Sequence, residues 1–384
     1  MEINREDIFV VAAVAAASPV LADLSRRVRV PIVVAEIGLG IIVGPQLLGL
    51  ASTDSFIEGL STLGLAFLFF LAGLEIEFER IRGVPLRLGA IGWGVSLGLG
   101  IALAVALWLT GLIDAPVLVG LALTTTALGT LMPILRDAGI LRERFGNYVL
   151  GAGAVGEFGP VVIVSIILAL EAGEPLRTAL LFVFAAVAVI AALVATRAQP
   201  ERIVRLVEST MRTSGQVAVR LTLMVLVGLA VLASEFGLDV ILGAFAAGII
   251  VGFVTRGGTE SGEFEGKLDA LGYGFLIPIF FISTGMDFDL DALVESPSAI
   301  ALVPGFAVLF LIARGVPAWF FYRGELESTD RRALALLSAS ALPLLVAITE
   351  TGVMRADEAV ALVGAGMLSV LLFPLLALAI RSKP

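Results

Sequence analysis

The stretch LTTTALGTLMP, residues 123–133, places four threonines, a glycine and a proline inside an apolar run. With its apolar flanks the segment covers about residues 115–136, which is long enough to cross a hydrocarbon core about 30 Å thick. Proline interrupts a helix, and hydroxyl groups compete with the backbone for hydrogen bonds. The stretch therefore predicts a helix that breaks within the membrane and exposes hydroxyls and carbonyls at the break.

The composition indicates an all-α protein with many membrane spans. Of the 384 residues, 59% are hydrophobic and 15% are charged, and the mean hydropathy is +1.04. The chain has neither cysteine nor histidine. Disulfides, thiolate catalysis and zinc–thiolate sites are therefore excluded, and carboxylates are the main groups that can carry protons near neutral pH.

Apolar runs between charged or Gly/Pro-rich breaks predict thirteen transmembrane helices. Their approximate limits are 8–24, 31–49, 59–74, 86–110, 115–136, 147–170, 176–196, 217–234, 238–254, 269–286, 299–322, 332–351 and 358–380. When basic residues at span edges are assigned to the adjoining loop, 21 of the 25 Lys and Arg residues fall on one side. The positive-inside rule then predicts an integral protein of the plasma (inner) membrane, with the N-terminus outside and the C-terminus in the cytoplasm.

Four pairs of similar words recur in the same order, 208 to 214 residues apart. They are GIIVG at 40–44 and 248–252, FFLAGLEIEF at 69–78 and FFISTGMDFD at 280–289, TTTAL at 124–128 and SASAL at 338–342, and GAG at 151–153 and 364–366. Each pair joins spans seven apart, so the partners run in opposite directions. This predicts two six-helix inverted repeats, 1–171 and 217–384, with a linker helix and a cytoplasmic loop in 172–216. Secondary transporters with this architecture bind near the membrane midplane, at interrupted helices.

The second interrupted helix is predicted at LSASALPLL, residues 337–345, which pairs with the opening stretch. The hydroxyls and carbonyls around both breaks are candidate oxygen ligands for a dehydrated cation. The candidate residues are Thr124, Thr125, Thr126, Ser338 and Ser340. The alternative interpretation is structural, with each hydroxyl bonded back to the preceding turn of its helix.

Glu157 lies ten residues into the span 147–170, about 15 Å along the helix and near the middle of the membrane. Its counterpart in the second repeat is Val370, so the fold does not require a carboxylate at this position. We therefore predict that Glu157 binds a proton or the metal ion, Na⁺ or K⁺. The alternative is a structural ion pair. No resident cofactor is expected.

Two further charges are candidates for supporting roles. Arg314 is the only base well inside a predicted span, where it would stabilise a nearby acid or the C-terminal end of a half-helix, or else snorkel to an interface. Glu36 lies about a turn and a half into the span 31–49, either as an acid at the mouth of the pathway or as a partner of the basic residues at 26–29.

Together these words resemble the monovalent cation:proton antiporter superfamily, on its Kef-type side, with a sodium–proton exchanger-like membrane domain. The matching words are GIIVGPQLLGL, FLFFLAGLEIE, LTTTALGTLMPILRDAG, VLGAGAVGEFGP, LGAFAAGIIVG and PIFFISTGM. The resemblance covers nearly the whole chain. It implies thirteen helices, crossed discontinuous helices at the ion site, a homodimer in the lipid bilayer, and elevator-like exchange of a cation for protons.

The chain departs from the family at the site. Family members usually carry Asp-Asp, Asn-Asp or Gln-Asp where this chain has Gly156-Glu157, and the basic residue that matches Arg314 commonly pairs with the first of those residues. Kef-type proteins also often carry a cytoplasmic nucleotide-binding domain, whereas this chain ends four residues after the last predicted span. A separate cytoplasmic regulatory subunit is therefore a candidate partner, and no nucleic acid is expected.

One carboxylate predicts exchange of one proton for one cation, which is electroneutral. Burial can raise a carboxyl pKa by several units, which would bring proton and cation into competition near neutral pH. Two other functions remain open: a proton- or sodium-coupled solute symporter, and a membrane sensor that binds the ion without moving it. An enzyme is not expected, because the chain lacks histidine and the intramembrane aspartate pair of membrane proteases.

Overall fold

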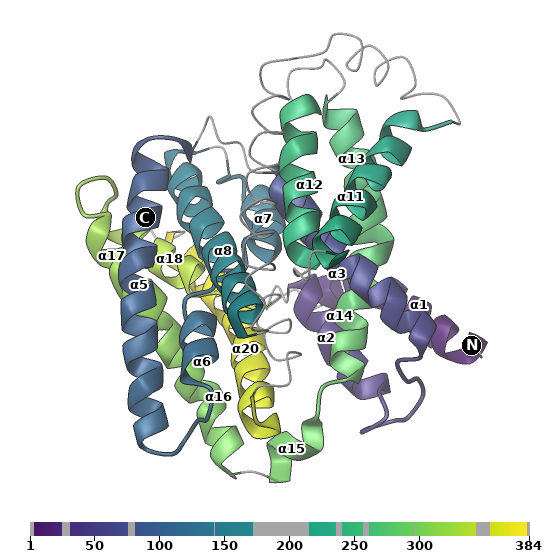
Figure 1. Cartoon of the computed structure of the whole chain (residues 1–384), viewed down its shortest axis with the longest axis horizontal. Coiled ribbons are helices and arrows are strands. Elements are labelled where there is room, and N and C mark those ends of the chain that lie inside the picture. Colours follow the sequence, from purple (N-terminus) through teal and green to yellow (C-terminus); the bar gives the residue numbers. More distant parts are fainter. Residues whose placement is uncertain are drawn as a thin grey trace. The chain divides into compact units, whose positions relative to one another are not determined.

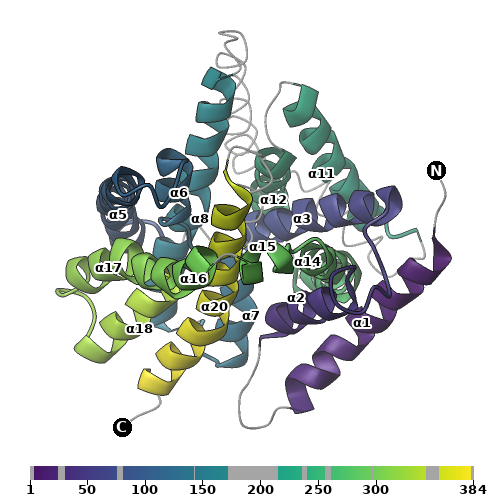
Figure 2. The ribbon, with the colours of Figure 1, turned by 90° about the horizontal axis from the view of Figure 1, so that it is seen from below.

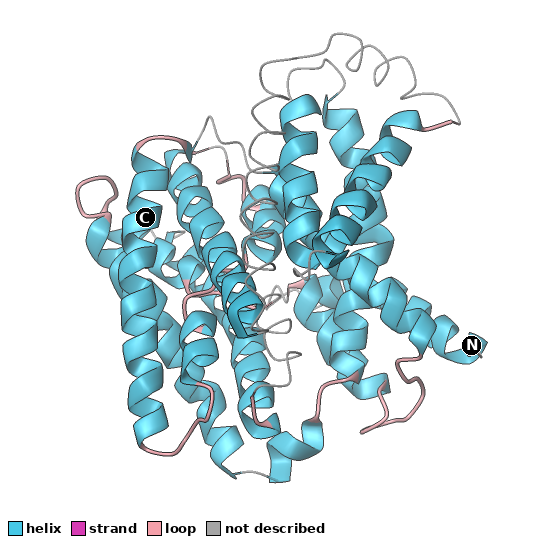
Figure 3. Ribbon diagram, in the orientation of Figure 1, coloured by secondary structure: helices cyan, strands magenta, loops and turns pink. Residues whose placement is uncertain are grey.

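The computed structural model describes residues 4–24, 31–75, 81–141, 143–171, 215–235, 240–255, 261–295, 297–342 and 354–381. Within these ranges helices are the only regular elements, as Figure 3 shows. The chain divides into two compact units, one formed by residues 1–54, 77–160 and 281–384, the other by residues 55–76 and 161–280. Two helices, α8 (Arg144–Glu171) and α14 (Ile277–Met286), contribute residues to both units.

Most of the described helices belong to the first unit, and Figure 1 labels its α-helices. Besides most of α8 and α14, they are α1 (Arg5–Leu24), α2 (Ile32–Val43), α5 (Val84–Leu109), α6 (Pro116–Ala122), α7 (Leu128–Asp137), α15 (Leu290–Glu295), α16 (Pro297–Phe310), the π-helical segment η2 (Leu311–Gly315), α17 (Val316–Phe321), α18 (Ser328–Ser338) and α20 (Ala356–Arg381). Within this unit α1 lies beside α2, and α16 packs along α20, in both Figure 1 and Figure 2.

The second unit contains α3 (Ser55–Glu75), α11 (Val217–Glu235), α12 (Val240–Thr255), α13 (Ser261–Leu271) and the π-helical segment η1 (Gly272–Leu276). Helices α3 and α12 pack closely because small residues face each other. A Cβ atom added to Gly73 would lie 2.5 Å from the carbonyl oxygen of Phe245, and one added to Gly248 would collide with the carbonyl oxygen of Phe70. Small residues permit such close backbone approach in membrane helices.

Seven described helical segments are long and apolar enough to cross a membrane. They are Ser55–Glu75, Val84–Leu109, Arg144–Val164, Val217–Glu235, Gly262–Met286, Ala299–Phe321 and Ala356–Arg381. They confirm the third, fourth, sixth, eighth, tenth, eleventh and thirteenth predicted spans. The second and ninth appear as the shorter apolar helices α2 and α12, and α1 covers the first. The seventh, 176–196, lies outside the described residues.

The predicted start of one span is wrong by about two turns. The tenth span was expected to begin near residue 269, but its helix begins at Ser261. The charged run that precedes the apolar residues continues the helix, and Lys267 pairs with Glu263 one turn earlier at 3.2 Å. Such i,i+4 pairs stabilise a polar helix end that hydropathy alone assigns to a loop.

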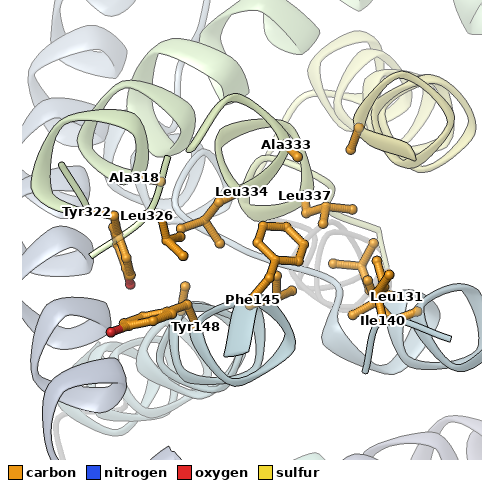
Figure 4. Packing of buried hydrophobic residues seen from close by; sticks show 14 residues of the cluster. Leu131, Ile140, Phe145, Tyr148, Ala318, Tyr322, Leu326, Ala333, Leu334 and Leu337 are labelled. Atoms are coloured by element: carbon orange, nitrogen blue, oxygen red, sulfur yellow. The ribbon is translucent and has the colours of Figure 1, made fainter. Parts of the chain in front are cut away.

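A buried apolar cluster in the first unit joins α7, α8, α17, α18 and α20. Figure 4 shows its side chains, including Leu131, Phe145, Leu334 and Leu337. Tyr148 and Tyr322 meet edge to face with ring centroids 5.6 Å apart. This cluster fixes the helices on which the polar residues of the predicted site are carried.

Ion pairs tie both ends of α20 to neighbouring segments. At its C-terminal end Arg381 bonds to Glu143 and Asp330, each at 2.8 Å. Just before its first residue, Arg355 contacts Asp114 at 3.3 Å and Glu358 at 3.2 Å. Exposed pairs are worth little one at a time, but shared partners make each cluster a network.

Candidate functional site

The helix break predicted within residues 123–133 is confirmed and covers residues 123–127. Helix α6 ends at Ala122 and α7 begins at Leu128. The hydroxyl of Thr124 donates to the carbonyl of Leu121 at 2.8 Å, and that of Thr125 to the carbonyl of Ala122 at 2.8 Å. These two protons bond back to the preceding turn, so only acceptor lone pairs remain available on the two oxygens.

The second predicted break lies against the first. Helix α18 ends at Ser338, residues 339–342 are not helical, and 343–353 lie outside the described residues. The amide of Ala127 donates to the carbonyl of Ser340 at 2.6 Å. The hydroxyl of Thr126 donates to the carbonyl of Ser338, also at 2.6 Å. Backbone groups that lose their helix hydrogen bonds at one break thus find partners in the other break.

Helix α8 offers this junction a backbone carbonyl that the amide of Pro160 cannot bond within the helix. Pro160 lies inside α8 and has no N–H, so it cannot bond to the carbonyl of Gly156 four residues earlier. That carbonyl accepts the amide of Thr126 at 3.0 Å. The sequence GEFGP thus anchors the break to the helix that carries Glu157.

Arg314 reaches the same junction from the π-helical segment η2, which interrupts the span Ala299–Phe321. Its side chain is 2% exposed. Nε donates to the hydroxyl of Thr126 at 3.0 Å, and Nη2 donates to the carbonyl of Ala152 at 2.6 Å. The guanidinium therefore does not snorkel to an interface. Short π-helical insertions of this kind occur frequently at functional sites.

Glu157 is buried, with 2% of its surface exposed, and follows Gly156 directly on α8. Ser338 and Ser340 are also buried, and their hydroxyl oxygens have no hydrogen-bond partner among the described residues. A buried hydroxyl without a partner is costly, which makes these two the candidate hydroxyls with the most to gain from a ligand.

Glu36 is buried on α2 and is 3% exposed. In the described part of the chain no hydrogen bond or ion pair connects it to the junction. The basic residues at 26–29, its other predicted partners, lie outside the described residues. The structure thus brings together Thr126, Ser338, Ser340 and Arg314 beside Gly156-Glu157, and leaves Glu36 apart from their hydrogen bonds.

Ser369 on α20 is a junction residue that the sequence did not predict. Its hydroxyl accepts the amide of Ala341 at 3.0 Å and donates to the carbonyl of Gly366 at 2.7 Å. A signal was present, because Ser369 lies 213 residues after Gly156, the spacing that relates the two GAG words.

No group of three or more Asp or Glu side chains gathers into a metal-binding cluster in the described ranges. The oxygens described at and beside this junction are the carboxylate of Glu157, hydroxyls and backbone carbonyls. Those are hard ligands that suit alkali metal ions rather than a resident transition metal.

The comparisons with known proteins agree with the resemblance seen in the sequence. A family model described as sodium/hydrogen exchanger, transmembrane, matches residues 10–378. The putative Na⁺/H⁺ antiporter YjbQ of Bacillus subtilis (strain 168) is 28% identical over 360 residues, covering 89% of this chain and 57% of the relative. The Na⁺/H⁺-K⁺ antiporter GerN of Bacillus cereus is 26% identical over 373 residues, covering 96% of this chain and 89% of the relative.

The Na⁺/H⁺ antiporter of Enterococcus hirae is 27% identical over 317 residues, 78% of each chain. Among solved structures, the sodium proton antiporter MjNhaP1 from Methanocaldococcus jannaschii at pH 8 superposes with a TM-score of 0.71. That match covers 98% of this chain and 99% of the other at 17% identity. The similarity to MjNhaP1 shows a shared fold.

Proposed function

The chain belongs to the sodium/hydrogen exchanger family of membrane transporters, which are not enzymes, and from that premise we propose that it exchanges Na⁺ or K⁺ for protons at Glu157. One observation carries the proposal. Glu157 is buried and directly follows Gly156, whose carbonyl accepts the amide of Thr126 in the first of two helix breaks that bond to each other. An ionisable side chain in the membrane interior is costly, and such residues usually mark an ion or proton pathway.

The oxygens around Glu157 support cation binding. The first candidates are the hydroxyls of Ser338 and Ser340, which have no hydrogen-bond partner in the described part of the chain. Thr124 and Thr125 offer lone pairs, and Thr126 acts mainly by holding the junction together. A proton on Glu157 cancels the charge that attracts the cation, so proton and cation compete for one site. Competition yields exchange when the empty, charged site cannot cross the membrane.

Alternating access is proposed to follow the inverted repeats expected from the sequence. Several correspondences support that symmetry. Pro160 and Pro374 lie inside α8 and α20 at a spacing of 214 residues, and Gly156 and Ser369 bond to the two breaks at a spacing of 213. Elevator-like movement about such a pair of crossed breaks, with both repeats contributing, fits this arrangement.

A single carboxylate further implies electroneutral exchange of one cation for one proton. We place the protein in the plasma (inner) membrane with its N-terminus outside, as the Lys/Arg distribution predicts. The homodimer is likewise proposed from the family. The transport of Na⁺ or K⁺ also belongs to the proposal, because the names of the relatives include both ions.

Reconstitution tests this function directly. Purified protein in proteoliposomes with a trapped pH-sensitive dye is challenged with Na⁺, K⁺ or Li⁺ at matched ionic strength, with choline as the control. The proposal predicts proton movement in response to at least one alkali cation and none in response to choline. Saturable cation binding without flux would instead identify a sensor. Proton flux that requires an added organic solute would identify a symporter.

A further inference from the structure

We propose that Gly156 and Arg314 act as a pair. Because Gly156 has no side chain, the guanidinium of Arg314 fits against α8, where it holds the helix break in the geometry that binds the ion. This inference rests on the proposed exchange function. Both are positioning residues, because they act on the break rather than on the ion.

The space at Gly156 is already filled by Arg314 and Thr126. A Cβ atom added at 156 would collide with Nη2 of Arg314 and would lie 2.9 Å from its Cζ and 2.5 Å from the hydroxyl oxygen of Thr126. Any other residue at this position must therefore displace both the guanidinium of Arg314 and the hydroxyl of Thr126 to which it is bonded. Gly156 lies inside α8, where glycine is unfavourable, and it has no positive φ that would require it. Space is thus the physical reason for this glycine.

The guanidinium then bridges three segments. Nη2 bonds to the carbonyl of Ala152 on α8, and Nε bonds to the hydroxyl of Thr126 in the first break. That hydroxyl donates its own proton to the carbonyl of Ser338 at the second break. A displaced guanidinium would lose both of its own bonds and would leave the bond between Thr126 and Ser338 without that support. The planar fork of arginine makes these contacts from two nitrogens held at a fixed spacing, whereas lysine has all its donors on a single nitrogen.

Among the described residues, the two hydrogen-bond acceptors of Arg314 are uncharged oxygens. The guanidinium is therefore fixed by geometry at the helix that carries Glu157, rather than paired with a second acid on the same helix. This explains why glycine precedes Glu157 in a working site, because Arg314 occupies the space that a polar side chain at position 156 would need. The expected consequence is an effect of the pair on cation affinity.

The test is a double-mutant cycle of Gly156→Ala and Arg314→Lys, read as the apparent KM and maximal rate of cation-dependent proton exchange in proteoliposomes. Each single variant should raise KM by about tenfold, with a smaller effect on the maximal rate. The double variant should raise it no further than Arg314→Lys alone, because coupled residues are not additive. Gly153→Ala on the same helix is the control, since its Cβ would meet only the Leu128 side chain, whose tip lies at 2.7 Å.

A roughly hundredfold effect in the double variant, which is the product of two independent tenfold effects, would overturn the pairing. In that case Gly156→Ala would have the same effect in the Arg314→Lys background as in the wild type, and the glycine would act through Thr126. If Gly156→Ala fails to fold, Arg314→Lys alone still tests the guanidinium: its KM should rise about tenfold, and an unchanged KM would count against the proposal. If the wild-type protein shows no exchange, the proposed function fails first, and the same cycle measured as thermal stability in detergent decides the pairing alone.

Discussion

Removing the hydroxyl of Thr126 should destabilise the protein far more than removing that of Thr124, two residues away. In Thr126→Val the buried Nε–H of Arg314 loses its acceptor and the carbonyl of Ser338 loses its donor. A hydrogen bond to a charged group contributes about 1.5–3 kcal/mol and a neutral one about 0.5–1.5 kcal/mol. The expected loss in the free energy of unfolding is therefore about 2–4.5 kcal/mol.

Thr124→Val is the matched control because valine has the same shape and the position is equally buried. Only one neutral bond is lost there, from the hydroxyl to the carbonyl of Leu121, so the expected cost is about 0.5–1.5 kcal/mol. The assay is reversible unfolding in mixed detergent micelles, followed by circular dichroism. Equal costs for the two variants would refute the account of Thr126 as the link between Arg314 and the two helix breaks.

Three other predictions concern the oxygens of the site, a surface carboxylate and the exchange stoichiometry. Ser340→Ala should raise the apparent KM for the cation in proteoliposomes while the maximal rate changes little, because it removes a candidate ligand, and Ser338→Ala should do so to the same degree or less. An unchanged KM in both variants would assign the hydroxyls a structural role. The hydrogen bond from the Tyr148 hydroxyl, and after it the bond from the Arg144 guanidinium, lowers the pKa of Glu325 below its ordinary value. The ionised Glu325 therefore stabilises the fold above the ordinary carboxyl range, and this stability is lost as pH falls through the lowered pKa. Wild type should accordingly be more stable than Glu325→Gln at neutral pH and equal to it in strong acid, and a pH-independent difference in thermal stability would contradict this. Finally, a potential set with valinomycin, with no pH gradient, should drive no cation-dependent acidification in proteoliposomes, because Glu157 is the single acid proposed to act at the junction; strong potential-driven acidification would require a second moving charge.

The sequence predicts the helices and the location of the break because both depend on local composition. The run of threonines from Thr124 to Thr126 marks the interruption, and the apolar lengths mark the spans. Hydropathy carries no information on polar helix ends, which is why the first two turns of α13 were assigned to a loop. The seventh predicted span and the second half of the twelfth lie outside the described residues and stay predictions.

The partners within the site depend on long-range packing, which composition does not encode. Nothing local to Arg314 indicates that its acceptors are the hydroxyl of Thr126 and a carbonyl on α8. The role of Pro160 was open to prediction, since a proline frees the carbonyl four residues earlier, yet the donor that reaches Gly156 comes from another span. Ser369 was open to prediction from the repeat spacing alone.

The central claim is that the carboxylate of Glu157 carries the exchange, and Glu157→Gln tests it most directly. Glutamine keeps the shape of the side chain but cannot be ionised, whereas Glu157→Asp, the control, keeps the carboxylate one methylene shorter. Cation-dependent proton movement in proteoliposomes should be absent from Glu157→Gln and present, with altered affinity, in Glu157→Asp, while both variants keep the helical content of the wild type. Exchange at the wild-type rate in Glu157→Gln would contradict the account and move the search for the proton carrier to Glu36.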